Sequence, residues 1–312
     1  MLSSGAPCRV TAGVRSRGRN VTIDASHFSY LCDFILRRSA IVLTPEKEYL
    51  VESRLGPVAR AKGFASIDAL IAALRVSSPG PLQTSVVEAM TTHETTFFRD
   101  QHPFDALRTQ ILPALLKSRA ASRKLVIFCA ACSSGQEPYS IAMLIREHFP
   151  ELSSWTVRIV GVDLSEAVLA RAREGLYTQS EVNRGLPAPL LVKYFDRVGT
   201  NWQLRPVIRN MVELRQMNLI EPWPTLPRAD LMFIRNVLIY FDIATKRSIL
   251  GRAREVLARD GYLLLGGAET TLNVDDRYQR VGLGQTTVYR LAGAEAQAGD
   301  PALSLGRRVA TS

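Results

Sequence analysis

The sequence has few cysteines and no long apolar run, and both absences exclude classes of protein. Cys129 and Cys132 form a C-x-x-C pair, but no second cysteine or histidine pair completes a zinc site, so a redox or metal role is disfavoured. No apolar stretch approaches the roughly 20 residues of a membrane span. Residues 1–20 carry arginines without an apolar core, which argues against a secretory signal. We therefore expect a reduced, cytoplasmic protein that does not insert into a membrane.

Dense blocks of charge are also missing. The chain of 312 residues has a net charge of +10, which permits an acidic protein, nucleic acid or an anionic membrane as partner. The basic residues are spread out, however, with no lysine- or arginine-rich block and no interleaved aromatic residues. A soluble basic protein is the simplest interpretation, and nucleic acid is not the expected partner.

Two nucleotide-binding motifs are absent from the stretch around which the chain is organised, Phe128–Ile145. This stretch predicts a buried strand, a turn of small residues and a helix. Nucleotide-like ligands bind at such turns in α/β sheets, although an ordinary strand–turn–helix has the same pattern. Ser134 and Glu137 have the spacing of a capping box. The turn lacks G-x-G-x-x-G, G-K-[ST] and any basic residue for a phosphate. The pattern therefore favours a nucleoside without phosphate, such as S-adenosylmethionine.

The order of the predicted elements indicates an α/β fold with an all-helical domain in front of it. Helical patterns fill residues 24–90, where Ser26 is expected to cap the first helix, and one amphipathic helix is predicted over residues 104–116. Strands and helices then alternate, which predicts a Rossmann-like, parallel, doubly wound sheet with a small inserted β-subdomain. The predicted segments are a disordered basic arm (1–20), a helical domain (21–90), a linker that contributes to the site (91–103), an α/β domain (104–291) with its insertion at about 176–210, and a disordered tail (292–312).

Three sets of polar residues follow predicted strands, and parallel strands end at one edge of a sheet. They are the 134–137 turn, Asp163 and the pair Arg235–Asn236. Asp163 lies roughly 30 residues after the turn, at a spacing suited to ribose hydroxyls. We therefore expect the three sets to share one crevice that binds a nucleoside-containing ligand.

Three motifs, Thr92–Asp100, Ala131–Ser140 and Arg235–Asp242, resemble those of the CheR-type chemotaxis receptor methyltransferases in order and spacing. The resemblance covers residues 24–291. It implies a monomeric S-adenosylmethionine-dependent O-methyltransferase that converts glutamates in the cytoplasmic domains of chemoreceptors to methyl esters. The family usually has asparagine where this chain has His93. The resemblance implies cofactor contacts at His93, Thr95, Arg99, Glu137, Asp163, Asn218, Leu219, Arg235 and Asn236.

The implied reaction needs neither a general base nor a metal, because a glutamate side chain with a pKa of about 4.3 is already ionised at neutral pH. The site must instead align a carboxylate oxygen with the methyl group. Arg99 is the expected carboxylate clamp, and a salt bridge to Asp100 or Glu94 is its structural alternative. Tyr240 is the expected second donor, and a core ring is its alternative.

Partner docking is expected on the helical domain, where basic residues near helix ends would meet acidic receptor helices: Arg37, Arg38, Arg54, Arg60 and Lys62. The predicted hairpin 198–204 is short, so we do not expect it to hold a receptor peptide. Two alternatives remain, a cofactor-binding signalling module without catalysis and a methyltransferase for another acceptor. An adenine methyltransferase is disfavoured because Asn/Asp-Pro-Pro-aromatic is absent where Arg235–Leu238 stands.

Overall fold

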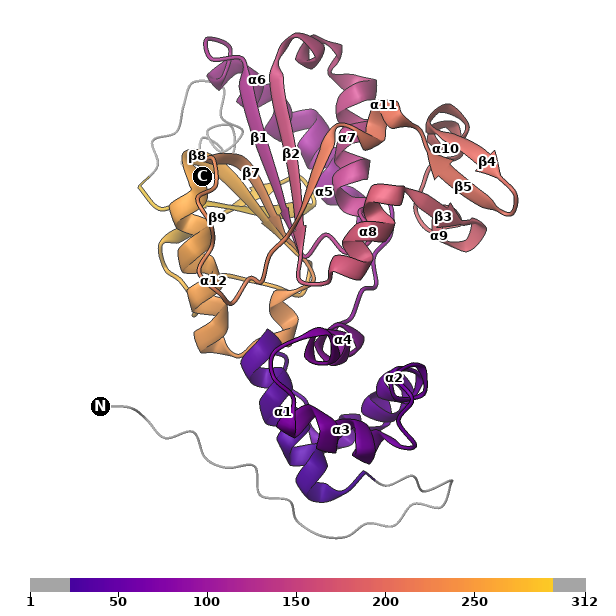
Figure 1. The fold of residues 1–312 in the computed structure, drawn as a ribbon. Helices are drawn as coiled ribbons and strands as arrows, with labels where there is room; N and C mark the ends of the chain where they lie inside the picture. Colours follow the sequence, from indigo (N-terminus) through magenta and orange to yellow (C-terminus); the bar gives the residue numbers. More distant parts are fainter. Residues whose placement is uncertain (1–22, 294–312) are drawn as a thin grey trace. The chain divides into compact units, whose positions relative to one another are not determined.

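Residues 23–293 are described by the computed structural model, and they divide after Thr92 into two units (Figure 1). The predicted basic arm lies outside the described residues, as does the predicted tail apart from Ala292 and Gly293. Within the described range, no helix combines the length and apolar character needed to cross a membrane.

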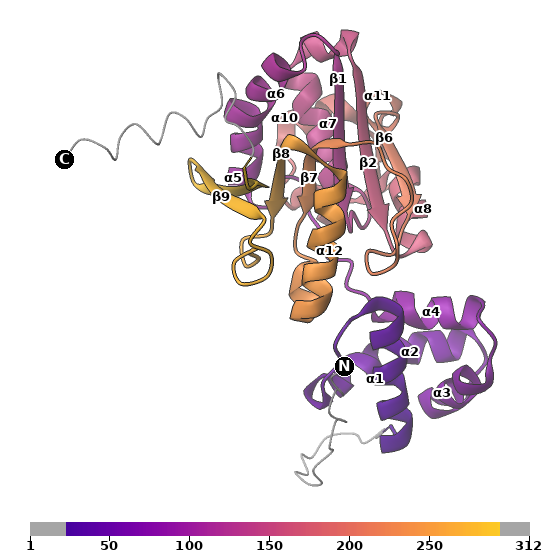
Figure 2. The same ribbon diagram turned by 90° about the vertical axis from the view of Figure 1, so that its left-hand side faces the viewer.

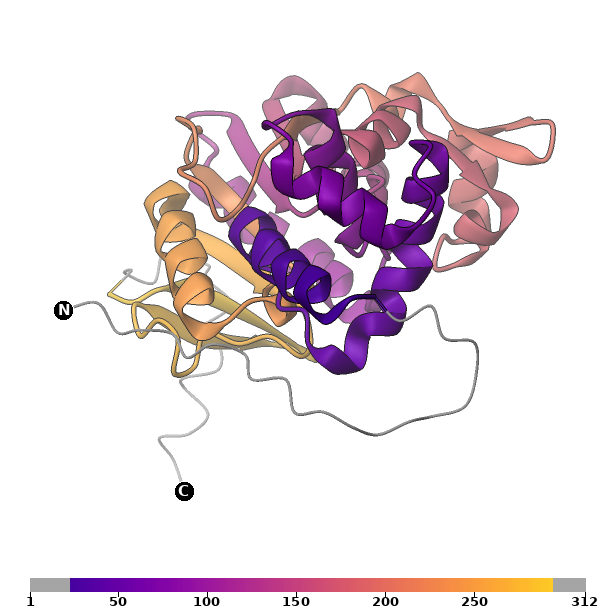
Figure 3. The ribbon, with the colours of Figure 1, turned by 60° about the horizontal axis from the view of Figure 1, so that its bottom comes forward.

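The first unit is all-helical, as the sequence predicts. Its apolar core includes Leu31, Leu55 and Leu70, all fully buried. Asp24, and not Ser26, caps the first helix, because its Oδ1 accepts the backbone N–H groups of residues 26 and 27. The helices, shown in indigo and purple in Figure 3, are α1 (Ala25–Ser39), the 3-10 turn η1 (Pro45–Lys47), α2 (Glu48–Ala61), α3 (Ile67–Val76) and α4 (Pro81–Met90).

The second unit contains a seven-stranded sheet in the order β6-β2-β1-β7-β8-β10-β9. The first five strands in that order are parallel, whereas β10 pairs antiparallel with both β8 and β9. The parallel part confirms the predicted Rossmann-like fold, and the antiparallel edge was not predicted. The strands are β1 (Lys124–Ala130), β2 (Thr156–Asp163), β6 (Val212–Gln216), β7 (Ala229–Ile234), β8 (Leu257–Leu265), β9 (Tyr278–Leu283) and β10 (Thr286–Leu291).

Helices cover both faces of this sheet (Figure 2), and an apolar cluster packs against each face. The larger cluster packs helices α5 (Gln101–Ala106), α6 (Leu112–Ser118), α7 (Gln136–His148) and α8 (Glu166–Glu174) on one face. The smaller packs α12 (Ile243–Val256) and the loop after β6 on the other. Cys129 and Cys132 are buried free thiols, and burial raises the pKa of both, so neither is a reactive thiolate at neutral pH.

The single helix predicted over residues 104–116 is wrong in one respect. The chain forms α5, then a π-helical turn over Leu107–Ile111, then α6. Pro113 sits in the first turn of α6 and has no N–H for the α-helical ladder, and the π turn accommodates this missing donor.

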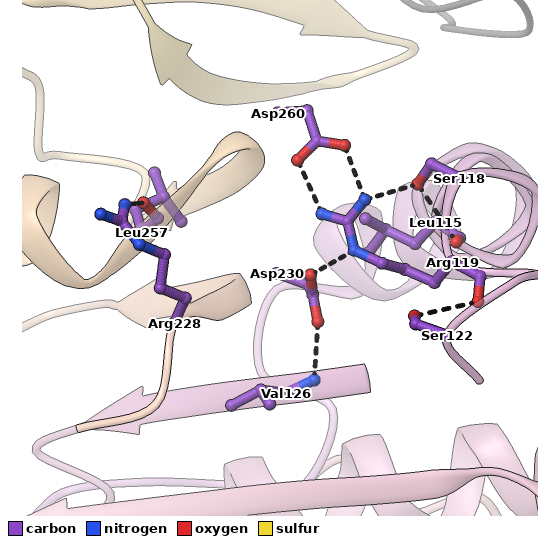
Figure 4. A network of polar contacts seen from close by, with 9 residues as sticks. All are labelled: Leu115, Ser118, Arg119, Ser122, Val126, Arg228, Asp230, Leu257 and Asp260. Atoms are coloured by element: carbon purple, nitrogen blue, oxygen red, sulfur yellow. Dashed lines mark hydrogen bonds and ion pairs between the residues drawn. The ribbon is translucent and has the colours of Figure 1, made fainter. Parts of the chain in front are cut away.

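A half-buried arginine joins three strands toward their amino ends (Figure 4). Arg119 Nε donates to Asp230 Oδ1 at 2.6 Å, and its two Nη atoms donate to Asp260 at 2.8 and 2.6 Å. The second oxygen of Asp230 accepts the N–H of Val126 in β1 at 2.8 Å. This amino-end network fixes the chain before β1 to β1, β7 and β8.

The predicted β insertion is a three-stranded sheet in the order β3-β5-β4. Tyr177 of β3 is 1% exposed, and its hydroxyl donates to the carbonyl oxygen of Ser134, the turn after β1. Phe97 packs edge-on against this tyrosine. The insertion therefore packs directly on the predicted site, and its elements are β3 (Leu176–Thr178), α9 (Gln179–Asn183), α10 (Ala188–Tyr194), β4 (Phe195–Val198), β5 (Asn201–Leu204) and α11 (Pro206–Arg209).

Candidate active site

The turn between β1 and α7 is built from left-handed backbone conformations. Ala131, Ser133 and Gly135 have φ values of 52°, 50° and 90°. Gly135 is the N-cap of α7, so Ser134 lies one position too early to cap the helix, and its hydroxyl bonds the side chain of Gln136 instead. The predicted capping box is therefore wrong. A Cβ on Gly135 would come within 2.7 Å of the Tyr139 ring, so both space and conformation require glycine here.

Asp163 at the end of β2 bonds this turn, as the strand-end argument predicts. Its two oxygens accept the N–H groups of Ser133 at 2.8 Å and Ser165 at 3.0 Å. The carboxyl is 7% exposed, and this burial raises its pKa, while the two amides oppose the shift. The hydroxyl of Ser133 also donates to the carbonyl oxygen of His93 at 2.8 Å, which attaches the 93–100 segment to the turn.

Arg235 is the centre of a second buried network, at the carboxyl ends of the strands. Its side chain is 2% exposed, and Nη1 donates to Glu137 Oε2 at 2.9 Å. Nη2 donates to Asp100 Oδ2 and to the carbonyl oxygen of Arg99, both at 2.9 Å. Nε is buried and has no hydrogen-bond partner among residues 23–293. Burial raises the pKa of Glu137, and the Arg235 guanidinium opposes that shift.

The Arg99 side chain does not form the salt bridge to Asp100 that was its structural alternative. Asp100 pairs with Arg235, and Nη1 of Arg99 donates to the carbonyl oxygen of Glu94 at 3.1 Å. Both Phe98 and Asp100 have positive φ, so the backbone on either side of Arg99 is strained. Strain of this kind is retained where the surrounding contacts fix a functional geometry.

The loop after β7 is held by a residue that the sequence reasoning missed. Glu269 accepts four backbone N–H groups, from Asn236 and Gly266 on Oε2 and from Val237 and Ile239 on Oε1, at 2.7 to 3.2 Å. A pocket of about 490 Å³ opens beside it, lined in part by Arg235. Glu269 follows the end of β8, so the same strand-end argument could have found it.

The remaining predicted cofactor residues lie beside these networks. The N–H of Met217 donates to the carbonyl oxygen of Asp163 at 2.9 Å, which places Asn218 and Leu219 next to the end of β2. Asn218 Oδ1 accepts the N–H of Ile220, and the carbonyl oxygen of Leu219 accepts two side-chain donors. Thr95 is half-buried between His93 and Arg99, and Tyr240 is half-buried at the end of the 3-10 turn η4 (Leu238–Tyr240).

The predicted docking residues of the helical unit differ in what they bond. Arg54 donates to the carbonyl oxygens of Met90 and Thr91 and to the hydroxyl of Thr92, so its guanidinium holds the end of its own unit together. Arg38 is exposed and bonds Gln83. The other three are exposed: Arg37, Arg60 and Lys62.

Two family models match the chain and divide it as the fold does. The CheR methyltransferase all-alpha domain matches residues 26–91, and the CheR methyltransferase SAM binding domain matches residues 93–287. The chain belongs to the CheR methyltransferase family. It is therefore an S-adenosylmethionine-dependent methyltransferase by family, which confirms the predicted resemblance and the predicted cofactor.

Curated relatives agree with the family models. Chemotaxis protein methyltransferase 1 of Pseudomonas aeruginosa is 41% identical over 262 residues, covering 82% of this chain and 94% of the relative. Chemotaxis protein methyltransferase 1 of Vibrio cholerae is 34% identical over 275 residues, covering 87% and 98%. A solved TehB-like SAM-dependent methyltransferase of Corynebacterium glutamicum aligns with a TM-score of 0.33 at 13% identity over 61% of this chain and 92% of its own, a similarity too weak to carry a conclusion.

The residues at the carboxyl ends of the strands fit this cofactor. An ionised carboxylate offers about four lone-pair sites. Asp163 accepts hydrogen bonds from two backbone N–H groups, so lone pairs remain that could accept ribose hydroxyls. The buried, unpaired Nε of Arg235 is a donor that a polar ligand group would satisfy. Ionised Glu137 and Asp163 also suit a ligand that carries a sulfonium charge.

Proposed function

We propose that this CheR family member transfers the methyl group of S-adenosylmethionine to glutamate side chains of chemoreceptors. The product is a glutamate methyl ester, the location is the cytoplasm, and the role is adaptation in chemosensory signalling. The observation that carries this proposal is the Arg235 network. It joins Glu137, a proposed cofactor residue, to the backbone of Arg99, the proposed carboxylate clamp. The relatives are named chemotaxis protein methyltransferases, which supports the same reaction.

The cofactor would be held by the networks described above. Asp163 would accept ribose hydroxyls, and Glu137 and Arg235 would bind the polar groups at the other end of the ligand. Bound S-adenosylmethionine supplies an electrophilic methyl group. The other residues in the proposed cofactor set are His93, Thr95, Arg99, Asn218, Leu219 and Asn236.

Arg99 and Tyr240 would orient the acceptor. A glutamate acceptor is ionised at neutral pH, so the site needs donors that fix the carboxylate and not a base that removes a proton. Arg99 uses one N–H on the Glu94 carbonyl within the described chain, and its other guanidinium donors can pair with a carboxylate in a fork. Tyr240 would donate its hydroxyl to the same acceptor.

The helical unit would supply docking. Its exposed basic side chains would attract acidic receptor helices, so we expect the receptor KM to rise with added salt. In this proposal residues 21–90 dock the receptor, 91–103 contribute to the site and 104–291 carry the chemistry, in a monomer. Arg54 contributes least to docking because its donors are already bonded within the unit.

The test is transfer of labelled methyl groups from S-adenosylmethionine to purified receptor cytoplasmic domains. We expect label that base releases, because methyl esters hydrolyse readily. Base-stable label would exclude glutamate as the acceptor, and cofactor binding without transfer to any receptor domain would favour the non-catalytic module.

The Arg99→Ala variant tests the clamp in the same assay. We expect it to remain folded and to lose methyl transfer. Its matched control is Arg158→Ala, which removes a partly exposed guanidinium from the opposite end of β2. Wild-type turnover in Arg99→Ala would refute the assignment of Arg99.

A further inference from the structure

Glu269 is a buried carboxylate that the proposed reaction does not use. Its exposed fraction is 9%, and all four of its hydrogen bonds come from backbone amides. Within residues 23–293, Glu269 forms no salt bridge with an arginine or a lysine. The four amides stabilise the carboxylate, and the carboxylate in turn bonds the loop, so Glu269 and the loop depend on each other.

The loop that Glu269 holds has little secondary structure of its own. Asn236 has a φ of 58°, and the chain after it forms only the short turn η4. Three of its N–H groups, from residues 236, 237 and 239, converge on the two oxygens of Glu269. The Glu269 carboxylate therefore replaces the backbone–backbone hydrogen bonds that would fix this segment in a helix or a strand.

The same loop carries residues for both halves of the reaction. Arg235 and Asn236 lie at its start, on the proposed cofactor side, and Tyr240 lies at its end, on the proposed acceptor side. We propose that Glu269 is the positioning residue that sets the distance between these two sides. The cofactor part of this inference rests on the family assignment, and the acceptor part rests on the proposed function.

Gly266 supports the inference independently. A Cβ at this position would lie 2.7 Å from Glu269 Oε2, 2.8 Å from Asn236 Nδ2 and 2.9 Å from Asn236 N. The close approach of β8, the carboxylate and the loop therefore leaves no room for a methyl group. At Gly282 in β9, a Cβ would meet nothing within 4 Å, and this glycine does not line the pocket beside Glu269. Gly266 and Gly282 thus form a pair of test and control positions.

The experiment compares Glu269→Gln and Gly266→Ala with two controls. Gly282→Ala makes the same change at an exposed position that does not line the pocket. Asp230→Asn removes the charge of an acid of similar burial, 7% exposed, at the other end of the sheet. For each variant, calorimetry gives the Kd for S-adenosylhomocysteine, methyl transfer gives kcat and the receptor KM, and denaturant gives stability.

We expect both Glu269→Gln and Gly266→Ala to weaken cofactor binding by about tenfold or more and to lower kcat further, because a displaced loop misplaces both reacting sides. In the glutamine variant an NH₂ group replaces one carboxylate oxygen and faces two backbone N–H groups, so these two hydrogen bonds are lost. The receptor KM should change little, because docking is elsewhere. Both controls should keep the wild-type Kd and kcat, although Asp230→Asn should be less stable.

Wild-type Kd and kcat in folded Glu269→Gln would overturn the proposal, as would a loss of stability alone that matches Asp230→Asn. If the wild-type protein methylates no receptor, the proposed function fails, but the Kd arm still decides whether Glu269 positions the cofactor side. The two hypotheses therefore fail separately.

Discussion

The second unit contains two arginine networks, one half-buried and one buried, at opposite ends of its parallel strands, and they differ in completeness. Arg119 at the amino end donates from Nε and both Nη atoms to Asp230 and Asp260 (Figure 4). Arg235 at the carboxyl end donates from both Nη atoms, and its Nε has no partner in the described chain. The first network is satisfied by the protein itself, whereas the second leaves a buried donor for a ligand.

This difference separates stability from function in one sheet. A fully bonded buried network contributes to folding, and an incomplete one costs free energy unless something else completes it. The pKa shifts point the same way. The Arg119 side chain lowers the pKa of Asp260 through hydrogen bonds, while burial raises that of Glu137 despite its partner. Four predictions test this separation.

The largest effect is expected for Arg235→Lys. Lysine keeps the charge but lacks the planar fork that reaches Glu137, Asp100 and the Arg99 carbonyl at once. We expect kcat/KM for methyl transfer to fall about 100-fold, which corresponds to about 2.7 kcal/mol of transition-state stabilisation. A circular dichroism spectrum like that of the wild type serves as the folding control, and an unchanged kcat/KM would show that the network is structural.

The reciprocal change, Arg119→Lys, should affect folding and not catalysis. We expect the free energy of unfolding to fall by about 2 kcal/mol, because several charge-assisted bonds are lost in a partly buried site. In the folded fraction kcat/KM should stay within about twofold of wild type. Denaturant titration and methyl transfer measure the two quantities, and a large loss of kcat/KM would end the proposed division between the two networks.

Acid should disable the two networks at different pH values. The folded pKa of Asp260 is lowered below its usual 3.8, so its contribution to stability is present above that value and is lost as the pH falls through the lowered pKa. The folded pKa of Glu137 is raised above its usual 4.5, so its charge is lost at a higher pH, before the amino-end network is affected. Affinity for S-adenosylhomocysteine should therefore fall while the protein is still folded.

The measurement is a pH series of that affinity and of unfolding free energy in the same buffers. Burial also raises the pKa of Asp163, which acts in the same direction. The Glu137→Gln variant distinguishes the contribution of Glu137 from that of Asp163. It should bind S-adenosylhomocysteine more weakly at all pH values, and its affinity should no longer show the fall that protonation of Glu137 causes. Affinity and stability that decline together would contradict the prediction.

The smallest effect is expected for an ion pair that is not buried. Arg158 and Glu213 pair at 3.0 Å on exposed parts of β2 and β6, with side chains 41% and 42% exposed. Such pairs are worth about 0–1 kcal/mol, so Arg158→Ala should change the free energy of unfolding by less than about 1 kcal/mol and leave kcat unaltered. A loss as large as that of Arg119→Lys would show that burial does not decide the difference.

The strand-end argument predicted much of the candidate site from the sequence. Glu137, Asp163 and Arg235 come from three separate strand ends, and the structure brings them to one edge of the sheet because those strands are parallel neighbours. Local chemistry is also sufficient at both ends of α8, where Ser165 caps the amino end and Gly175 ends the helix with a left-handed backbone.

Other features depended on tertiary contacts that no local pattern records. Ser134 was expected to cap α7, but Gly135 takes that place with a φ of 90°. Arg54 has the pattern of a surface residue on its helix, yet its donors bond carbonyl oxygens that are 36 and 37 residues away in sequence. Glu269 follows a strand end, which marks its position, but its four partners are backbone amides that no side-chain pattern records.

The contact of Tyr177 with the turn after β1 has a consequence for protein engineering. The inserted sheet β3-β5-β4 looks like a separate module that could be deleted to shorten the enzyme or replaced by another insertion. The hydroxyl of Tyr177, however, donates to the Ser134 carbonyl oxygen, and the Tyr177 ring packs edge-on against Phe97. A chain without the insertion would leave the Ser134 carbonyl without this donor and the Phe97 ring without this contact. The shortest functional form of this enzyme should therefore retain β3 and the strands that pair with it.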